Sequence, residues 1–157
     1  MVTRTLALLS ALVALVLVGC GGGDQLSKDE YIKELNAAGK ALSTSFGSLG
    51  QGISNTKDTS ALGAKFEEAG KVLRDASTKI ADISPPDAAK DANKKLADGL
   101  NAMADSFEAV AKESKNSKGN PASLLPKING LTSSDGIKQV TEAINDLKAK
   151  GYNVASN

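Results

Sequence analysis

Four stretches of the chain carry apolar residues at alternating gaps of three and four. Because an α-helix makes one turn in 3.6 residues, this spacing places the apolar side chains on one helical face. The pattern therefore predicts helices over residues 27–53, 59–83, 86–115 and 132–150. The large residues that define the four faces are Leu35, Leu42 and Phe46; Leu62, Phe66, Leu73 and Ile80; Leu96, Leu100, Phe107 and Val110; and Ile137, Val140, Ile144 and Leu147.

Capping and breaking residues predict where these helices begin and end. Ser27 and Glu30 have the spacing of a capping box, in which each side chain bonds the backbone amide of the other residue. Pro85 ends the second helix, because a proline pushes the residue before it out of the α region. Pro86 is expected at the first position of the third helix. Gly151 suits the left-handed residue that follows the last helix.

A shorter apolar group, Leu124, Leu125 and Ile128, predicts a short extra helix before the last long one. Short connections make successive helices antiparallel, and apolar spacing that averages about 3.5 residues favours packing at about 20° in a left-handed bundle. We therefore expect an all-α fold, an antiparallel up-down-up-down four-helix bundle over residues 27–151. Residues 152–157 are expected to form a C-terminal tail.

Several glycines fall inside the expected helices. Gly39, Gly63, Gly70 and Gly99 each cost about 1 kcal/mol of helix stability relative to Ala. This cost indicates either a close approach of two backbones or low stability, and the sequence leaves both explanations open. A glycine cluster at 47–52 is expected to end or fray the first helix near its last turn.

The first 20 residues have the layout of a secretory signal. Arg4 is followed by an apolar run of 13 residues, 6–18, in which Ser10 is the only polar residue. A helix that spans a hydrocarbon core needs roughly 20 such residues, and a buried core helix would normally show a polar face. A removable signal peptide over residues 1–19 is therefore the favoured interpretation.

Directly after this run lies the segment Leu17-Val18-Gly19-Cys20, which resembles the lipobox of bacterial lipoproteins. The resemblance implies that Cys20, the only cysteine of the chain, receives a diacylglyceryl group through a thioether. It also implies cleavage after Gly19, which makes Cys20 the mature N-terminus. Two acyl chains give stable anchoring. The body is then expected to be held at the extracytoplasmic face of the cell membrane through a tether, residues 20–26.

Composition and charge remove several classes of function. The chain has no His, so the commonest transition-metal ligand and the usual general base near pH 7 are missing. Neither a metal nor a cofactor is expected. Removal of Arg4 leaves 19 − 1 = 18 basic side chains against 18 acidic ones, and a neutral body has no basic surface for nucleic acid. No catalytic residue is assigned, although an enzyme that uses only Asp, Glu or Lys remains an alternative.

The mature body resembles the small helical lipoproteins of actinobacteria and firmicutes. The resemblance is carried by the segment Ser27-Lys28-Asp29-Glu30-Tyr31-Ile32 and by Ile83-Ser84-Pro85-Pro86 before an Ala-rich helix. Many such proteins have further cysteines in the first helix, where this chain has Ala and Gly, so no disulfide is expected. That group has no agreed activity. The resemblance therefore implies fold and location but no substrate.

These observations predict a non-enzymatic binding or interaction module of the cell envelope. Its partner would be an envelope protein or a small apolar ligand, and a structural spacer or coat lipoprotein is the other alternative. Tyr31 and Tyr152 are expected to be half-buried with their hydroxyls in water, where a partner could also contact them. A lined cavity inside the bundle would favour a ligand carrier, and a filled interior would favour surface contacts.

Overall fold

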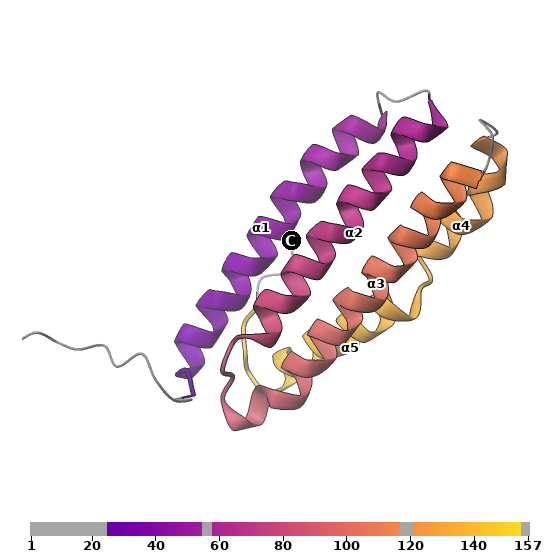
Figure 1. Ribbon diagram of the computed structural model, residues 1–157. Helices are drawn as coiled ribbons and strands as arrows, with labels where there is room; N and C mark the ends of the chain where they lie inside the picture. The colour runs from indigo at the N-terminus through magenta and orange to yellow at the C-terminus, as the bar shows by residue number, and fades with distance from the viewer. Residues whose placement is uncertain (1–24, 55–57, 117–120, 155–157) are drawn as a thin grey trace, which may run out of the picture.

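The computed structural model describes residues 25–54, 58–116 and 121–154, and most of these are helical (Figure 1). No strand occurs in these ranges, which confirms the all-α class. Residues 1–19 and Cys20 lie outside the described residues, so the signal peptide and the lipobox stay predictions. The helices are α1 (Lys28–Ser54), α2 (Thr59–Ala81), α3 (Lys90–Asn116), α4 (Leu125–Leu131) and α5 (Asp135–Ala149), with the 3₁₀ turns η1 (Asp87–Ala89) and η2 (Pro121–Leu124).

The long helices pack largely in their order along the chain. α1 lies beside α2, α2 beside α3 and α3 beside α5, while the short α4 packs on α3 (Figure 1). The contact between α2 and α3 is the most extensive of these. Within the described ranges, α1 and α5 share no comparable backbone interface. The packing is therefore loosest on the side where the first and last helices would meet.

Three helices begin at capping residues, and the sequence predicted the first of these caps. The amide of Ser27 donates to Glu30 Oε2 at 3.0 Å, and the amide of Glu30 donates to Ser27 Oγ at 3.3 Å, which confirms the capping box at the start of α1. Hydrogen bonds from Ser27 lower the pKa of the exposed Glu30 carboxyl. Asp58 accepts from the amide of Ser60 at 3.0 Å before α2, and Ser134 caps α5. Each cap gives a side-chain acceptor to an amide that has no partner inside the helix.

The turn between α2 and α3 differs in detail from the prediction. α2 ends at Ala81, before Ile83. The Ile83 amide instead bonds the carbonyl of Ile80, three residues back, at 3.3 Å, which is the tighter pattern of a 3₁₀ turn. Pro86 is the N-cap of η1 rather than the first residue of an α-helix, and its carbonyl accepts from the Ala89 amide at 2.8 Å. A 3₁₀ turn therefore precedes α3.

Four glycines lie where two helices approach each other closely. A Cβ on Gly99 of α3 would lie 3.0 Å from the carbonyl oxygen of Gly136 of α5, and a Cβ on Gly136 would lie 2.6 Å from the amide nitrogen of Met103. A Cβ on Gly63 or Gly70 of α2 would lie 2.6 or 3.0 Å from a side chain of α3. The sequence left two explanations open for these glycines, a close approach of two backbones or low stability. For the glycines of α2 and α3, the close approach of the helices is the explanation.

The glycines of α1 have a different environment. A Cβ on Gly39, Gly47 or Gly50 would have nothing within 4 Å, so no neighbouring element requires a glycine at these positions. The helix nevertheless continues through 47–52 and ends at Ser54. At these three positions the glycines lower helix propensity without permitting a closer contact.

The predicted faces of α2 and α3 form the centre of the core. Leu73 is 0% exposed and Leu100 is 3% exposed, as the spacing of the large residues predicted. The core also contains small residues that the spacing did not single out, and these are Ala97, Ala104 and Ala143. Small side chains let neighbouring helix axes approach, which agrees with the glycine contacts between α3 and α5.

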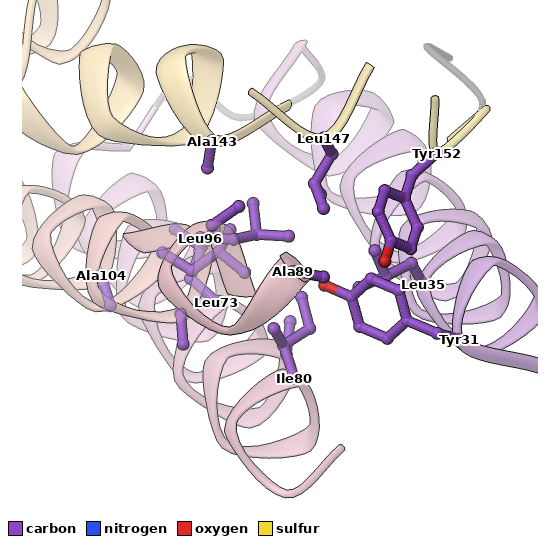
Figure 2. Packing of buried hydrophobic residues seen from close by; sticks show 14 residues of the cluster. Tyr31, Leu35, Leu73, Ile80, Ala89, Leu96, Ala104, Ala143, Leu147 and Tyr152 are labelled. Atoms are coloured by element: carbon purple, nitrogen blue, oxygen red, sulfur yellow. The ribbon is translucent and has the colours of Figure 1, made fainter. Parts of the chain in front are cut away.

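Both tyrosines lie inside the main core. Tyr31 is 0% and Tyr152 is 4% exposed, and their rings meet edge to face with centroids 5.6 Å apart (Figure 2). The expected half-burial was wrong for both, and the Tyr31 hydroxyl donates to Asn93 rather than to water. Gly151, at φ 78°, turns the chain back after α5, and the Tyr152 amide donates to the Leu147 carbonyl at 2.9 Å. Tyr152 therefore belongs to the folded body rather than to a tail.

Candidate functional site

An apolar cavity of about 130 Å³ lies where α1 faces α2, α3 and α5. Gly39 and Leu42 line it from α1, Ile80 from α2, Leu100 from α3 and Ile144 from α5. We call it the core cavity. Its walls come from four helices that are far apart in the sequence, so the cavity exists only when α1 is packed on the other three.

On one side of the core cavity, a buried polar contact holds α1 in place. The hydroxyl of Tyr31, one turn before Leu35, donates to Asn93 Oδ1 at 3.0 Å, and Asn93 Nδ2 donates to the Ile80 carbonyl at 2.9 Å. Figure 2 shows the rings of Tyr31 and Tyr152 beside Leu35. Burial raises the pKa of the Tyr31 hydroxyl, and Tyr152 adds to the shift. The hydroxyl is therefore a neutral donor at any pH near neutrality.

On the other side of the core cavity, an aromatic contact holds α1. The ring of Phe46, one turn after Leu42, meets the ring of Phe107 of α3 edge to face, with centroids 5.7 Å apart and planes at 88°. Phe107 also contacts Phe66 of α2. Such ring pairs contribute about 0.5–1.5 kcal/mol beyond the area that they bury. Residues 35–42 of α1 therefore cross the cavity between two aromatic contacts.

The core cavity opens between α1 and α5. Its lining residues on α2 and α3 are all buried, among them Ile80, which is 5% exposed, and Leu100, which is 3% exposed. The half-buried members of the lining all belong to α1, to α5 or to Val154 beyond α5. This distribution agrees with the missing backbone interface between the first and last helices. We call this opening the mouth.

Among the residues that the structure describes, none that lines the core cavity is charged. Asn36 is the only one of these lining residues with a polar side chain, and it is half-buried. An enclosed apolar cavity of about 150 Å³ can stay free of water and take up benzene or xenon. Because a buried charge or polar group without a partner costs free energy, a cavity of this composition favours an apolar ligand over a charged one.

A more open hollow of about 370 Å³ lies between α1 and α2. Its walls include the side chains of Glu34, Lys79 and Asp82, which are all exposed. Water therefore competes with any ligand for these charged groups. The core cavity, which is smaller but apolar and better enclosed, is the stronger candidate for a binding site.

Ion pairs between helices lie on the surface. Arg74 of α2 binds Asp105 and Glu108 of α3 at 2.7 and 2.9 Å, and Lys95 of α3 binds Glu142 of α5 at 2.9 Å. Among the described residues, none of the ion pairs between helices includes a residue of α1. Exposed pairs contribute only about 0–1 kcal/mol each. The attachment of α1 therefore depends on the buried hydrogen bond of Tyr31 and on its apolar and aromatic contacts.

The structure does not describe the site residues that the sequence predicted. Leu17, Val18, Gly19 and Cys20 lie outside the described residues. In the part of the chain that the structure describes, no helix is both long and apolar enough to cross a membrane. No cluster of His, Cys, Asp and Glu side chains in those ranges is suited to a metal ion.

Sequence reasoning did not locate the core cavity. The one available signal was Gly39, which falls on the apolar face of α1 between Leu35 and Leu42. A small residue at an inward position indicates either a close contact or an unfilled space, and only the packing of the other helices decides between them.

Comparisons with known proteins supply no relative from which a role could be carried over. No protein-family model, no curated protein and no solved structure matches this chain. Its function therefore has to be argued from its own residues.

Proposed function

We propose that this protein is a lipid-anchored lipoprotein of the cell envelope whose helical body binds a small apolar ligand without catalysing a reaction on it. The observation that carries the binding role is the core cavity, about 130 Å³ in volume and lined by apolar side chains. Of the roles that the sequence left open, an apolar ligand carrier is the one that a lined interior favours.

The proposal includes an antiparallel up-down-up-down arrangement of α1, α2, α3 and α5. It is supported by the order of the helix contacts, in which each long helix packs on the next. It is also supported by the short turn 82–86 between α2 and η1, because so few residues cannot return the chain to the other end of a helix.

The anchor follows from the resemblance to the lipobox and from the position of the tether. Residues 20–25 can span at most ~20 Å when fully extended. The body begins next to η1, because the Leu26 amide donates to the Ser84 carbonyl at 2.9 Å and Gln25 Nε2 donates to Asp87 Oδ1 at 2.6 Å. Lipidation of Cys20 would therefore keep this end of the body within ~20 Å of the bilayer surface.

The anchor is tested by the variant Cys20→Ala. We expect the wild-type chain to incorporate labelled fatty acid in a bacterial host and to appear at the mature size. The variant should incorporate none and should accumulate as the precursor, because the thioether needs the sulfur atom. Equal labelling of the variant and the wild type would refute the lipid anchor.

The binding role is tested separately, on a soluble form that lacks residues 1–20. We expect benzene to raise its unfolding midpoint in a saturable way, because a ligand that binds only the folded state stabilises it by RT ln(1 + [L]/Kd). Glycerol, which is polar and of similar size, is the control and should give no saturable shift. Absence of a benzene effect would favour the spacer or the surface-contact alternative.

A further inference from the structure

We infer that the core cavity holds the end of one hydrocarbon chain of a free single-chain amphiphile, such as a fatty acid, whose polar head stays in water at the mouth. The inference rests on the proposed function, since it names the ligand class of the same cavity. Four observations carry it: the volume of the cavity, the composition of its wall, the position of its mouth and the open space at Gly39.

The volume limits how much of a ligand can enter. Pockets that enclose whole drug-sized molecules measure about 300–1,000 Å³, whereas the core cavity measures about 130 Å³. A small group or the end of a longer molecule therefore fits, and the rest of that molecule remains outside. One chain end fills such a volume, so a lipid with two chains could place only one of them in the cavity, whereas a single-chain amphiphile has no second chain to accommodate.

The wall favours an aliphatic chain. Apart from Asn36, every lining residue is Leu, Ile, Val, Ala or Gly. No aromatic ring is among the lining residues in the described part of the chain, so a planar ligand would find no ring there to stack on. A hydrocarbon chain needs no such partner, because it binds through removal of its apolar surface from water.

The mouth gives an amphiphile a place for its head. Val140 and Ile144 of α5 and Gly39 of α1 are half-buried lining residues on the open side, and the opposite wall, on α2 and α3, is buried. A chain that enters between α1 and α5 therefore ends against Leu96 and Leu100, while its head remains at the surface. No charge has to be buried, which a charged head group would otherwise require.

The signal segment is a poor alternative occupant. An α-helix with its side chains is about 10–12 Å across, and a helix formed by residues 6–18 would be far larger than a cavity of about 130 Å³. A single hydrocarbon chain is thinner and flexible.

Gly39 provides a substitution that fills the cavity without disturbing the fold. It lines the cavity, and a Cβ at this position would have nothing within 4 Å. Because Gly39 lines the cavity, we expect the side chain of Gly39→Leu to occupy part of the space that the ligand needs. Gly47→Leu is the matched control, because Gly47 lies in the same helix, also has nothing within 4 Å of its Cβ position, and is exposed on the surface.

The experiment uses photocrosslinking of the full chain mixed with phosphatidylcholine vesicles. The probe is an octanoic acid with a diazirine at its methyl end, because only a short chain can place its methyl end inside and its carboxyl group at the mouth, and crosslinked peptides are identified by mass spectrometry. We expect labels on lining residues such as Leu100 and Ile144. We expect Gly39→Leu to reduce them at least tenfold and Gly47→Leu to leave them unchanged. A diazirine next to the carboxyl group should label the mouth instead of the interior.

Each outcome of the crosslinking experiment either supports or overturns the inference. Labels confined to the lining and lost in Gly39→Leu support it. Labels that survive in Gly39→Leu overturn it, provided that circular dichroism shows the variant folded with an unfolding midpoint at or above that of the wild type. If that variant is not folded, Gly39→Met takes its place, because the flexible Met side chain adapts to irregular spaces.

Two further results separate this inference from the proposed function. A phosphatidylcholine that carries the same diazirine chain should label the interior at least tenfold less than the free acid. Equal or stronger labelling would make a bilayer lipid the occupant and overturn the inference. A saturable benzene shift without any labelling by the octanoic acid probe would also overturn it, while the proposed binding role would stand.

Discussion

The α2–α3–α5 side of the molecule and the α1 side contain similar residues but are packed differently. Leu73 and Ala104 on the first side are 0% exposed, and the α3–α5 crossing brings Gly99 to within contact of Gly136. On α1, the large residues beyond Leu35 whose side chains the structure describes, Leu42 and Phe46, are only half-buried. Similar residue types therefore give a filled interior on the α2–α3–α5 side and a hollow beside α1.

This difference shows that glycine has two opposite structural roles in one helical fold. At Gly99 and Gly136 the missing side chains allow two backbones to touch. At Gly39 the missing side chain leaves room that no neighbour fills. A body selected only for stability would be expected to fill that room, because unfilled apolar space costs packing free energy. This retained space is the feature of α1 on which the proposed binding role rests.

The comparison is tested most strongly by truncating one leucine on each side. Leu73→Ala should cost about 2–5 kcal/mol of unfolding free energy, because a fully buried side chain leaves a cavity in a rigid surrounding. Leu42→Ala should cost only about 1 kcal/mol, because part of its surface is already in water and its neighbours already enclose a space. Urea unfolding of the soluble form lacking residues 1–20 measures both.

The midpoint difference is meaningful only if both variants keep the wild-type m-value. Equal losses for Leu73→Ala and Leu42→Ala would show that α1 is packed as tightly as α2 and α3. The α1 side would then not differ in packing from the α2–α3–α5 side. Such a result would contradict a cavity beside α1 that can take up a ligand.

Much of the fold was accessible from the sequence, because its signals are local. The capping box of Ser27 and Glu30 and the three-four spacing through Leu73 and Leu100 depend only on residues within a few turns of one another. Both are confirmed. The exact end of α2 was not accessible in this way, because the 3₁₀ bond from Ile83 competes with the helical one by a small margin.

The candidate site was not accessible, because it depends on which helices meet. Gly39 and Gly99 both lie inside helices with similar apolar spacing, yet one lines a hollow and the other a contact. Tyr152 lies beyond the last helix, and nothing local shows that Gly151 returns it to the core beside Tyr31. Tertiary packing decides such cases, and a single sequence carries no direct record of it.

A smaller effect is expected at the α3–α5 crossing. Gly136→Ala should cost about 1–3 kcal/mol, the usual range for overpacking, because the new methyl group would lie 2.6 Å from the Met103 amide nitrogen. A backbone atom cannot move aside as a side chain can, so α5 has to shift. Thermal or urea unfolding measures the loss. A neutral or stabilising result would mean that the two helices are not in close contact.

The smallest effect should have the opposite sign. Gly39→Ala is expected to stabilise the protein by about 0.5–1 kcal/mol, because Ala lowers the entropy of the unfolded chain and favours the helix, and no neighbour lies within 4 Å of the new methyl group. Gly47→Ala, also in α1 and also unobstructed, provides the control for helix propensity alone. Any gain of Gly39→Ala over Gly47→Ala then measures packing into the cavity, whereas a loss at Gly39 would show that the space is already occupied by protein atoms.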